Sequence, residues 1–345
     1  MSPYALSIMI SGLAIGTMLT VSSSHWLLAW VGLEINTLAI IPLMTNKHHP
    51  RATEATTKYF LTQATASALI LFTSMGNAWI TGQWDIKDLH PTMSNMMTIA
   101  LMMKLGLAPM HFWLPEVMQG LNLTTGFILA TWQKIAPMTL MYMIHTTLNP
   151  TLLIMIGILS ALTGGWGGLN QTELRKIMAY SSIAHLGWMV VILPFSPKLA
   201  MLNFTLYLIM TSAMFLTIIF LQTTKLSSMS LTWPKSPLLA ALSIMTLLSL
   251  AGLPPTTGFM PKWLILQELT KQHTTIIATV MAFSALLSLF FYLRLSYMLS
   301  LTQAPNTVNS LPTWYHSQKQ PTWLLASLTV TASMLLPLTP NIMSW

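Results

Sequence analysis

Long apolar stretches, interrupted by short polar clusters, run along the whole chain. Several of them contain no Asp, Glu, Lys or Arg and exceed the roughly 20 residues that a membrane-spanning helix needs. Examples of such charge-free stretches are residues 59–84, 135–172, 199–224, 236–261 and 320–345. Apolar and polar positions do not alternate with a period of two, so a membrane β-barrel fits poorly. The pattern predicts an all-α, polytopic membrane protein.

Prolines and polar clusters divide this pattern into about eleven transmembrane helices within a single integral membrane domain, residues 1–345. The expected helix limits are 3–22, 25–44, 55–80, 93–118, 122–146, 150–171, 175–194, 199–224, 237–270, 274–300 and 322–341. An odd number of spans puts the two termini on opposite sides of the membrane.

With the mid-span Lys104, Lys134 and Lys262 set aside, the other basic residues choose between the two orientations, because the cytoplasmic or matrix side is enriched in Lys and Arg near the span ends. Nine fall on the side of the N-terminus: Lys47, Arg51, Lys58, Arg175, Lys176, Lys225, Lys235, Arg294 and Lys319. Three fall on the other side: Lys87, Lys198 and Lys271. The count predicts an N-terminus on the cytoplasmic or matrix side.

The composition argues against several classes of protein and of functional site. The chain is 54% hydrophobic and only 6% charged, whereas soluble domains carry about 25% charged residues. It has no cysteine, so disulfides, iron–sulfur clusters and thiolate metal sites are excluded. The net charge is +8, but the basic residues are scattered rather than clustered, so we expect no nucleic-acid partner.

Two short sequences with the same pattern of glycine and proline lie inside the fourth and ninth expected spans. "GLAPMHFWLP" begins at Gly106 and "GLPPTTGFMP" at Gly252, and both read Gly-Leu-x-Pro with a second proline six residues later. Proline interrupts helical hydrogen bonding, so we expect breaks near Leu107–His111 and Leu253–Phe259. Non-helical backbone at membrane depth is tolerated only where it is buried or lines a wet cavity.

The two breaks lie five helices apart, so the second would enter the membrane from the opposite side. This spacing predicts two inverted five-helix repeats, about residues 3–146 and 150–300, followed by a C-terminal helix at about 322–341. Inverted repeats with broken helices are typical of transporters, whose working site lies at the midplane. Chance placement of the prolines is the alternative.

Several ionisable residues fall inside the expected spans, and the candidates for function among them are Glu34, Lys104, His111, Lys134, His185 and Lys262. Each charge at the bilayer centre costs roughly 2.5–3.5 kcal/mol, so three lysines cost on the order of 8–10 kcal/mol. Structural ion pairs are the alternative explanation, but one central carboxylate cannot pair three lysines. Burial disfavours the charged forms of lysine and glutamate, so such groups can exchange protons near neutral pH. A string Glu34–Lys104–Lys134–(His185)–Lys262 would form a proton relay.

Other sites fit these residues less well. For His111 and His185, a hydrogen-bonded packing role remains an open alternative to proton transfer. A haem would need paired axial histidines, whereas the interior histidines come one per helix. "GGWGG" at 164–168 is typical of close helix packing and lacks the strand that accompanies a phosphate-binding loop.

Two longer motifs carry a family resemblance. "KLGLAPMHFWLPE" (104–116) and "QTELRKIMAYSSIAHLGWM" (171–189) resemble the signatures of the antiporter-like, proton-translocating subunits of respiratory complex I. The resemblance runs from the first helix to about residue 300. It implies that Glu34 pairs with Lys104 and that Lys134 and Lys262 are the central and second-break basic residues. His111 and His185 match histidines in the two motifs.

The resemblance also implies a function and a location. The chain would be a redox-free subunit that couples electron transfer from NADH to ubiquinone, carried out in other subunits, to proton translocation. It would bind no cofactor itself. It would lie in the mitochondrial inner membrane, with its N-terminus on the matrix side and its C-terminus on the intermembrane side. Its partners would be other membrane-arm subunits, including a neighbouring antiporter-like chain, and lipids such as cardiolipin. Most relatives carry three further helices before the glutamate helix, so one flank of the bundle would be open.

Two rival functions remain. A free-standing cation/proton antiporter would share the fold and the buried charges. A structural scaffold with vestigial lysines is the second rival, and the cost of burying three lysines counts against it.

Overall fold

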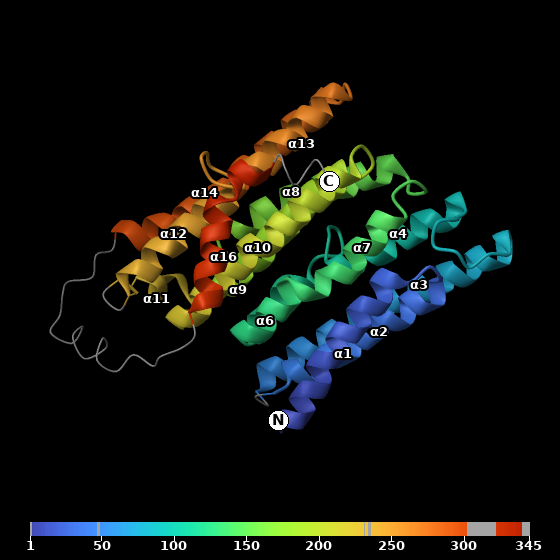
Figure 1. The fold of residues 1–345 in the computed structure, drawn as a ribbon, viewed down its shortest axis with the longest axis horizontal. Coiled ribbons are helices and arrows are strands. Elements are labelled where there is room, and N and C mark those ends of the chain that lie inside the picture. Colours follow the sequence, from blue (N-terminus) through green and yellow to red (C-terminus); the bar gives the residue numbers. More distant parts are fainter. Residues whose placement is uncertain (1, 47–48, 231, 234–235, 302–321, 340–345) are drawn as a thin grey trace. The chain divides into compact units, whose positions relative to one another are not determined.

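The computed structural model describes residues 2–46, 49–230, 232–233, 236–301 and 322–339, and every regular element within these ranges is a helix (Figure 1). The chain divides into two compact units. One comprises Met1–Ser160 and Met189–Pro197, and the other comprises Ala161–Trp188 and Lys198–Trp345. The division falls within the helices α8 (Pro150–Gly168) and α9 (Leu174–Ile192) and after the first residue of α10 (Pro197–Leu221).

The first unit is built from paired helices. Its elements are α1 (Pro3–Ser22), α2 (Trp26–Met44), α3 (Pro50–Thr81), α4 (Pro91–Leu105), α5 (Trp113–Gly120), α6 (Leu123–Ala130), the 3-10 turn η1 (Trp132–Lys134) and α7 (Ile135–Met143). The helices α1 and α2 lie side by side (Figure 1). A Cβ atom on Gly16 would lie 2.8 Å from the carbonyl oxygen of Gly32, so small residues permit this close approach.

Among the described residues, the second unit contains the two longest of the apolar helices that could span a membrane. Beyond parts of α8 and α9, its elements are α10 (Pro197–Leu221), α11 (Leu226–Ser230), α12 (Pro237–Ala251), α13 (Phe259–Lys271), α14 (Thr275–Leu301), α16 (Trp323–Met334) and the 3-10 turn η2 (Leu336–Leu338). The glycines at 164–168 pack as expected. A Cβ on Gly164 would lie 2.6 Å from the amide nitrogen of Ala184 in α9, and one on Gly165 would lie 2.8 Å from Leu287 Cβ in α14.

Prolines mark helix starts throughout the described residues. Six helices have proline as their first residue: Pro3, Pro50, Pro91, Pro150, Pro197 and Pro237. Proline suits this position because the first N–H groups of a helix have no partner within it and because the ring fixes a helical φ. The prolines that divide the sequence pattern therefore do so by starting helices.

Both expected breaks are confirmed. The fourth expected span is two helices, α4 and α5, with a break from Gly106 to Phe112, and the ninth expected span is α12 and α13, with a break from Gly252 to Gly258. Each first half-helix ends at a glycine with positive φ, 76° at Gly106 and 79° at Gly252. Each break also contains one cis X-Pro peptide bond.

Other limits differ from the expected ones. Within the described residues, five helices are long and apolar enough to span a membrane: Pro3–Ser22, Trp26–Met44, Pro150–Gly168, Pro197–Leu221 and Thr275–Ser300. The helix α3 begins five residues earlier than expected, at Pro50, and the short helix α11 was not predicted. Three of the basic residues used to choose the orientation, Lys47, Lys235 and Lys319, lie outside the described residues, as do residues 340–341 of the expected last helix.

Candidate functional site

Lys104 lies in the last turn of α4, two residues before the first break. Its side chain is buried, with only 6% of its surface exposed. Its Nζ atom has no hydrogen-bond partner among the residues that the structure describes. An ammonium group in such a place is costly unless it loses its proton or gains polar neighbours.

Neutral side chains satisfy the carbonyl groups at the end of α4. The indole Nε1 of Trp113, the first residue of α5, donates to the carbonyl oxygen of Met103 at 3.2 Å. The amide of Gln63 in α3 donates to the carbonyl oxygen of Lys104 at 3.5 Å. The side chain of Lys104 is therefore not used to cap its own helix.

Lys134 lies at an interruption of the fifth span that the sequence pattern did not predict. The helix α6 ends at Ala130, the 3-10 turn η1 covers Trp132–Lys134, and α7 continues from Ile135. The cause is Pro137, which has no N–H to donate to the carbonyl of Gln133 and whose ring clashes with the preceding turn. Lys134 is 3% exposed, so a second lysine is buried beside interrupted backbone.

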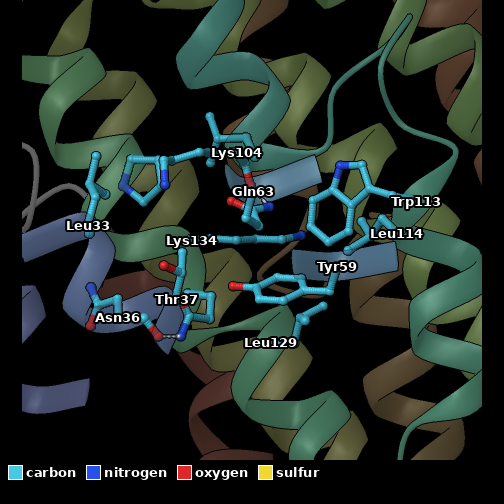
Figure 2. Close-up of a pocket in the computed structure, with 14 residues that line it drawn as sticks. Leu33, Asn36, Thr37, Tyr59, Gln63, Lys104, Trp113, Leu114, Leu129 and Lys134 are labelled. Carbon is cyan, nitrogen blue, oxygen red and sulfur yellow. Dashed lines mark hydrogen bonds between the residues drawn. The ribbon is translucent and has the colours of Figure 1, made fainter. Parts of the chain in front are cut away.

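Lys104 and Lys134 line the same small cavity in the first unit (Figure 2). Its volume is ≈ 20 Å³, measured as the space open to the centre of a water molecule, and about 10–15 Å³ is enough for one water. The other polar side chains at its wall are Asn36, Thr37, Tyr59, Gln63 and Gln133. The structure therefore brings together two of the three predicted lysines in a polar cavity of water size.

Glu34 lies near this cavity without touching a lysine directly. It is half-buried on α2, and its Oε2 atom accepts a hydrogen bond from Thr37 Oγ1 at 2.9 Å. Within the described residues it forms no ion pair shorter than 4.0 Å. Its carboxylate still attracts the ammonium of Lys104 electrostatically. The direct Glu34–Lys104 pair that the resemblance implied is thus absent from this structure, and the attraction acts over a longer distance.

His111 lies inside the first break but outside the cavity wall. It is 7% exposed, and its ring packs on Phe112 with centroids 4.3 Å apart. The backbone N–H of Leu114 donates to the carbonyl of His111 at 3.1 Å, which helps to start α5. In this structure His111 therefore has packing contacts, and a role in proton transfer stays a prediction.

His185 and Lys262 belong to the second unit. Nε2 of His185 lies 3.4 Å from the hydroxyl of Tyr292. Lys262, in the first turn of α13, is half-buried, and its Nζ donates to the carbonyl oxygen of Ala251 at 2.8 Å. Ala251 is the last residue of α12, so Lys262 caps the helix before the second break.

A surface ion-pair cluster joins α3 to α5, the helix that follows the first break. Lys58 Nζ on α3 lies 2.7 Å from Glu116 Oε2 on α5 and 2.8 Å from Glu54 Oε1. All three side chains are largely exposed, so the cluster contributes little stability by itself.

Sequence reasoning missed the polar wall of the cavity. Thr37 and Tyr59 are uncharged residues on apolar helices, and nothing in the pattern separates them from other hydroxyl residues. A usable signal for Thr37 was its position three residues after Glu34, which places both on one face of a helix.

Comparison with known proteins identifies the family. The model for the transmembrane region of NADH:quinone oxidoreductase and Mrp antiporter subunits matches residues 23–288, and the model for the C-terminus of NADH dehydrogenase subunit 2 matches residues 289–343. NADH-ubiquinone oxidoreductase chain 2 of Xenopus laevis is 62% identical over 341 residues, which is 99% of each chain. The chain belongs to the NADH-ubiquinone oxidoreductase chain 2 family. The corresponding protein of Danio rerio is 59% identical over 345 residues, again 99% of each chain.

Solved structures agree with this family. A chain of respiratory complex I from Thermus thermophilus has a TM-score of 0.87 and 26% identity, over 100% of this chain and 80% of that one. A chain of the Mrp complex from Dietzia sp. has a TM-score of 0.82 over 97% of this chain and 75% of that one, but at 15% identity it shows the fold alone. As a member of the chain 2 family, the protein is a multi-pass, antiporter-like membrane-arm subunit of NADH:ubiquinone oxidoreductase and assembles with other membrane subunits of complex I.

Proposed function

We propose that the chain moves protons through a relay of Glu34, Lys104, Lys134 and Lys262 when ubiquinone is reduced elsewhere in complex I. The observation that carries this proposal is the cavity that Lys104 and Lys134 line together. It has room for water and is bordered by uncharged polar side chains, so a proton could pass between the lysines through hydrogen bonds. His111 and His185 are secondary candidates in the same relay.

The interrupted helices create the polar surroundings in which a buried lysine can exchange its proton. Broken backbone exposes carbonyl groups and allows water to approach at membrane depth, where a continuous helix would not. A lysine there can be stabilised as an ammonium by those groups or can release its proton into the cavity. Movement of charge at Glu34 would shift the balance between these two states of Lys104 through their electrostatic attraction.

We extend the proposal to the arrangement of the helices. About eleven spans would form two inverted repeats, about 3–146 and 150–300, with the last helix at about 322–341. The matching ends of α4 and α12, at Gly106 and Gly252, support two copies of one unit. The excess of basic residues on one side supports a matrix-side N-terminus and an intermembrane-side C-terminus in the mitochondrial inner membrane.

We further propose that the chain carries no redox cofactor and is inactive alone. It has no cysteine, and the described residues hold no group of three or more His, Asp or Glu side chains placed to bind a metal ion. NADH, FMN, iron–sulfur clusters and ubiquinone would then belong to other subunits. A neighbouring antiporter-like chain and lipids such as cardiolipin would cover its flanks.

A free-standing cation/proton antiporter is the alternative, and the relatives do not favour it. The likeness to the Mrp complex concerns the fold, whereas the relatives reported above at about 60% identity are chain 2 proteins. Co-purification of the chain with an NADH-oxidising assembly separates the two: a chain that is isolated alone and exchanges cations for protons would favour the antiporter.

The relay is tested by removing each cavity lysine in the assembled complex. Lys104→Met and Lys134→Met should each reduce NADH-driven proton uptake tenfold or more, because one missing proton carrier interrupts the path. Lys271→Met is the matched control, since that lysine is exposed and lies at the end of α13. Proton uptake by both cavity variants at the level of the control would refute the relay.

A further inference from the structure

Two hydroxyl residues line the lysine cavity, and one of them, Thr37, is hydrogen-bonded to Glu34. Thr37 Oγ1 is 2.9 Å from Glu34 Oε2 and also 2.9 Å from the backbone oxygen of Glu34. Thr37 is 7% exposed and is part of the cavity wall. The carboxylate of Glu34 is therefore connected to the cavity through this side chain.

Tyr59 supplies the second hydroxyl. It is one of the largest fully buried side chains, 2% exposed, and comes from α3. Its ring packs edge-on against Trp113, with centroids 5.7 Å apart and planes at 62°. Figure 2 shows its hydroxyl directed toward Thr37, with the side chain of Lys134 extended between Tyr59 and Gln63. Thr37 and Tyr59 therefore belong to the same polar cavity wall.

A hydroxyl group can link a hydrogen-bond acceptor to a hydrogen-bond donor. A carboxylate only accepts hydrogen bonds, and a lysine ammonium only donates them, whereas a hydroxyl does both. Because Glu34 forms no ion pair within 4.0 Å in the part of the chain that the structure describes, a hydrogen-bonded connection to the lysines would need an intervening group. Thr37 and Tyr59 are placed to carry it, and both remain uncharged.

We propose that Thr37 and Tyr59 form a hydroxyl bridge that positions Glu34 and couples it, through the water-sized cavity, to Lys104 and Lys134. This inference rests on the proposed function of the lysines. In it, Thr37 and Tyr59 are positioning residues: they orient the acceptor and the cavity water and hold no net proton. The bridge explains how a glutamate without direct lysine contact can still influence the relay.

The test uses assembled complex I that carries variants of the two hydroxyl residues. Tyr59→Phe and Thr37→Val each remove a hydroxyl and preserve most of the packing volume, and Thr37→Ser restores the hydroxyl. Proton uptake per NADH oxidised should fall about fivefold in the first two, which matches the net value of one hydrogen bond, and should return in Thr37→Ser. Tyr142→Phe is the control, because Tyr142 packs beside His145 and does not line the cavity.

The outcomes separate the bridge from the relay. If Tyr59→Phe and Thr37→Val pump like the control while Lys104→Met does not, the bridge is wrong and the relay stands. If Lys104→Met and Lys134→Met also pump normally, the proposed function itself fails. Equal losses in Thr37→Ser and Thr37→Val would show that packing, not the hydroxyl, matters at this position, and would also overturn the bridge.

Discussion

The break after α4 and the break after α12 end their first half-helix in the same way. Gly106 and Gly252 have φ of 76° and 79°, and ψ of 42° and 41°. The N–H of Leu107 donates to Met102 at 3.1 Å, and that of Leu253 donates to Leu248 at 3.3 Å. These are the bonds of a helix end closed by a left-handed glycine. The sequence Gly-Leu-x-Pro therefore encodes the same helix C-terminal cap at both breaks.

The two breaks differ in how they use lysine. After α4, the neutral indole of Trp113 donates to Met103, and Lys104 Nζ has no hydrogen-bond partner among the described residues. After α12, the capping donor is Lys262 itself, bonded to Ala251. A cation at the C-terminal end of a helix is favoured by the helix dipole, so Lys262 gains stability there.

This difference separates two tasks that one residue type can perform. At the first break the end of the helix is capped by other groups, which leaves the lysine available to exchange its proton with the cavity. At the second break the lysine must give up a hydrogen bond before it can pass a proton on. The first break is therefore the better place to look for a group whose protonation changes during turnover.

The largest expected effect on stability is at the second break. Lys262→Met removes the donor to Ala251 and leaves a carbonyl at the helix end without it, which should cost about 1.5–3 kcal/mol, the value of a hydrogen bond to a charged group. Lys262→Arg should recover most of this loss, because a guanidinium can donate to the same oxygen. The measurement is the midpoint temperature at which the assembled complex releases this subunit. Equal midpoints for both variants would show that Lys262 has no capping role.

A smaller effect, equal at the two breaks, should follow from replacing either glycine. Alanine at Gly106 or Gly252 would adopt a left-handed conformation that costs roughly 1–2 kcal/mol for a residue with a Cβ atom. A Cβ at Gly106 would lie 3.2 Å from Trp113, and one at Gly252 would lie 3.0 Å from Lys262, so the crowding is also similar. The same thermal assay should give matching decreases. A loss at only one position would break the equivalence of the two helix ends.

The smallest effect concerns the neutral cap. Trp113→Phe removes the N–H that donates to Met103 and keeps an aromatic ring against Tyr59, so it should cost about 0.5–1.5 kcal/mol. If the cap also frees Lys104, proton uptake should fall further than this loss of stability accounts for. Unchanged stability together with unchanged proton uptake would show that the Trp113 hydrogen bond neither stabilises the end of α4 nor affects Lys104.

Sequence patterns predicted the backbone of the breaks well because local rules govern it. Glycine readily adopts the left-handed conformation that ends a helix, and the proline three residues later disfavours its continuation, so the breaks at 106–112 and 252–258 follow from local sequence. The interruption before Lys134 was missed because Pro137 is a lone proline in the expected span 122–146, without the Gly-Leu-x-Pro pattern that marked the other two breaks. Its effect appears one turn earlier, inside an apparently continuous apolar run.

The side-chain contacts could not be predicted in the same way. The sequence indicated that Lys104 and Lys134 are buried, and both are. It gave no sign that Lys262 would cap α12 or that Thr37 would hold Glu34, because these contacts depend on rotamers and on how helices distant in sequence pack. Charges in apolar spans therefore point to candidate residues, and tertiary structure decides what each one touches.

The central claim is that Lys104 must release a proton, not merely carry a charge. Lys104→Arg retains the positive charge, but its pKa above about 12 prevents release during turnover, whereas Lys104→Met removes both charge and proton. The measurement is NADH-driven proton uptake by assembled complex, with Lys271→Arg as the control. We expect Lys104→Arg to lose nearly as much proton uptake as Lys104→Met. Normal uptake by Lys104→Arg would show that the charge alone suffices and would contradict this account.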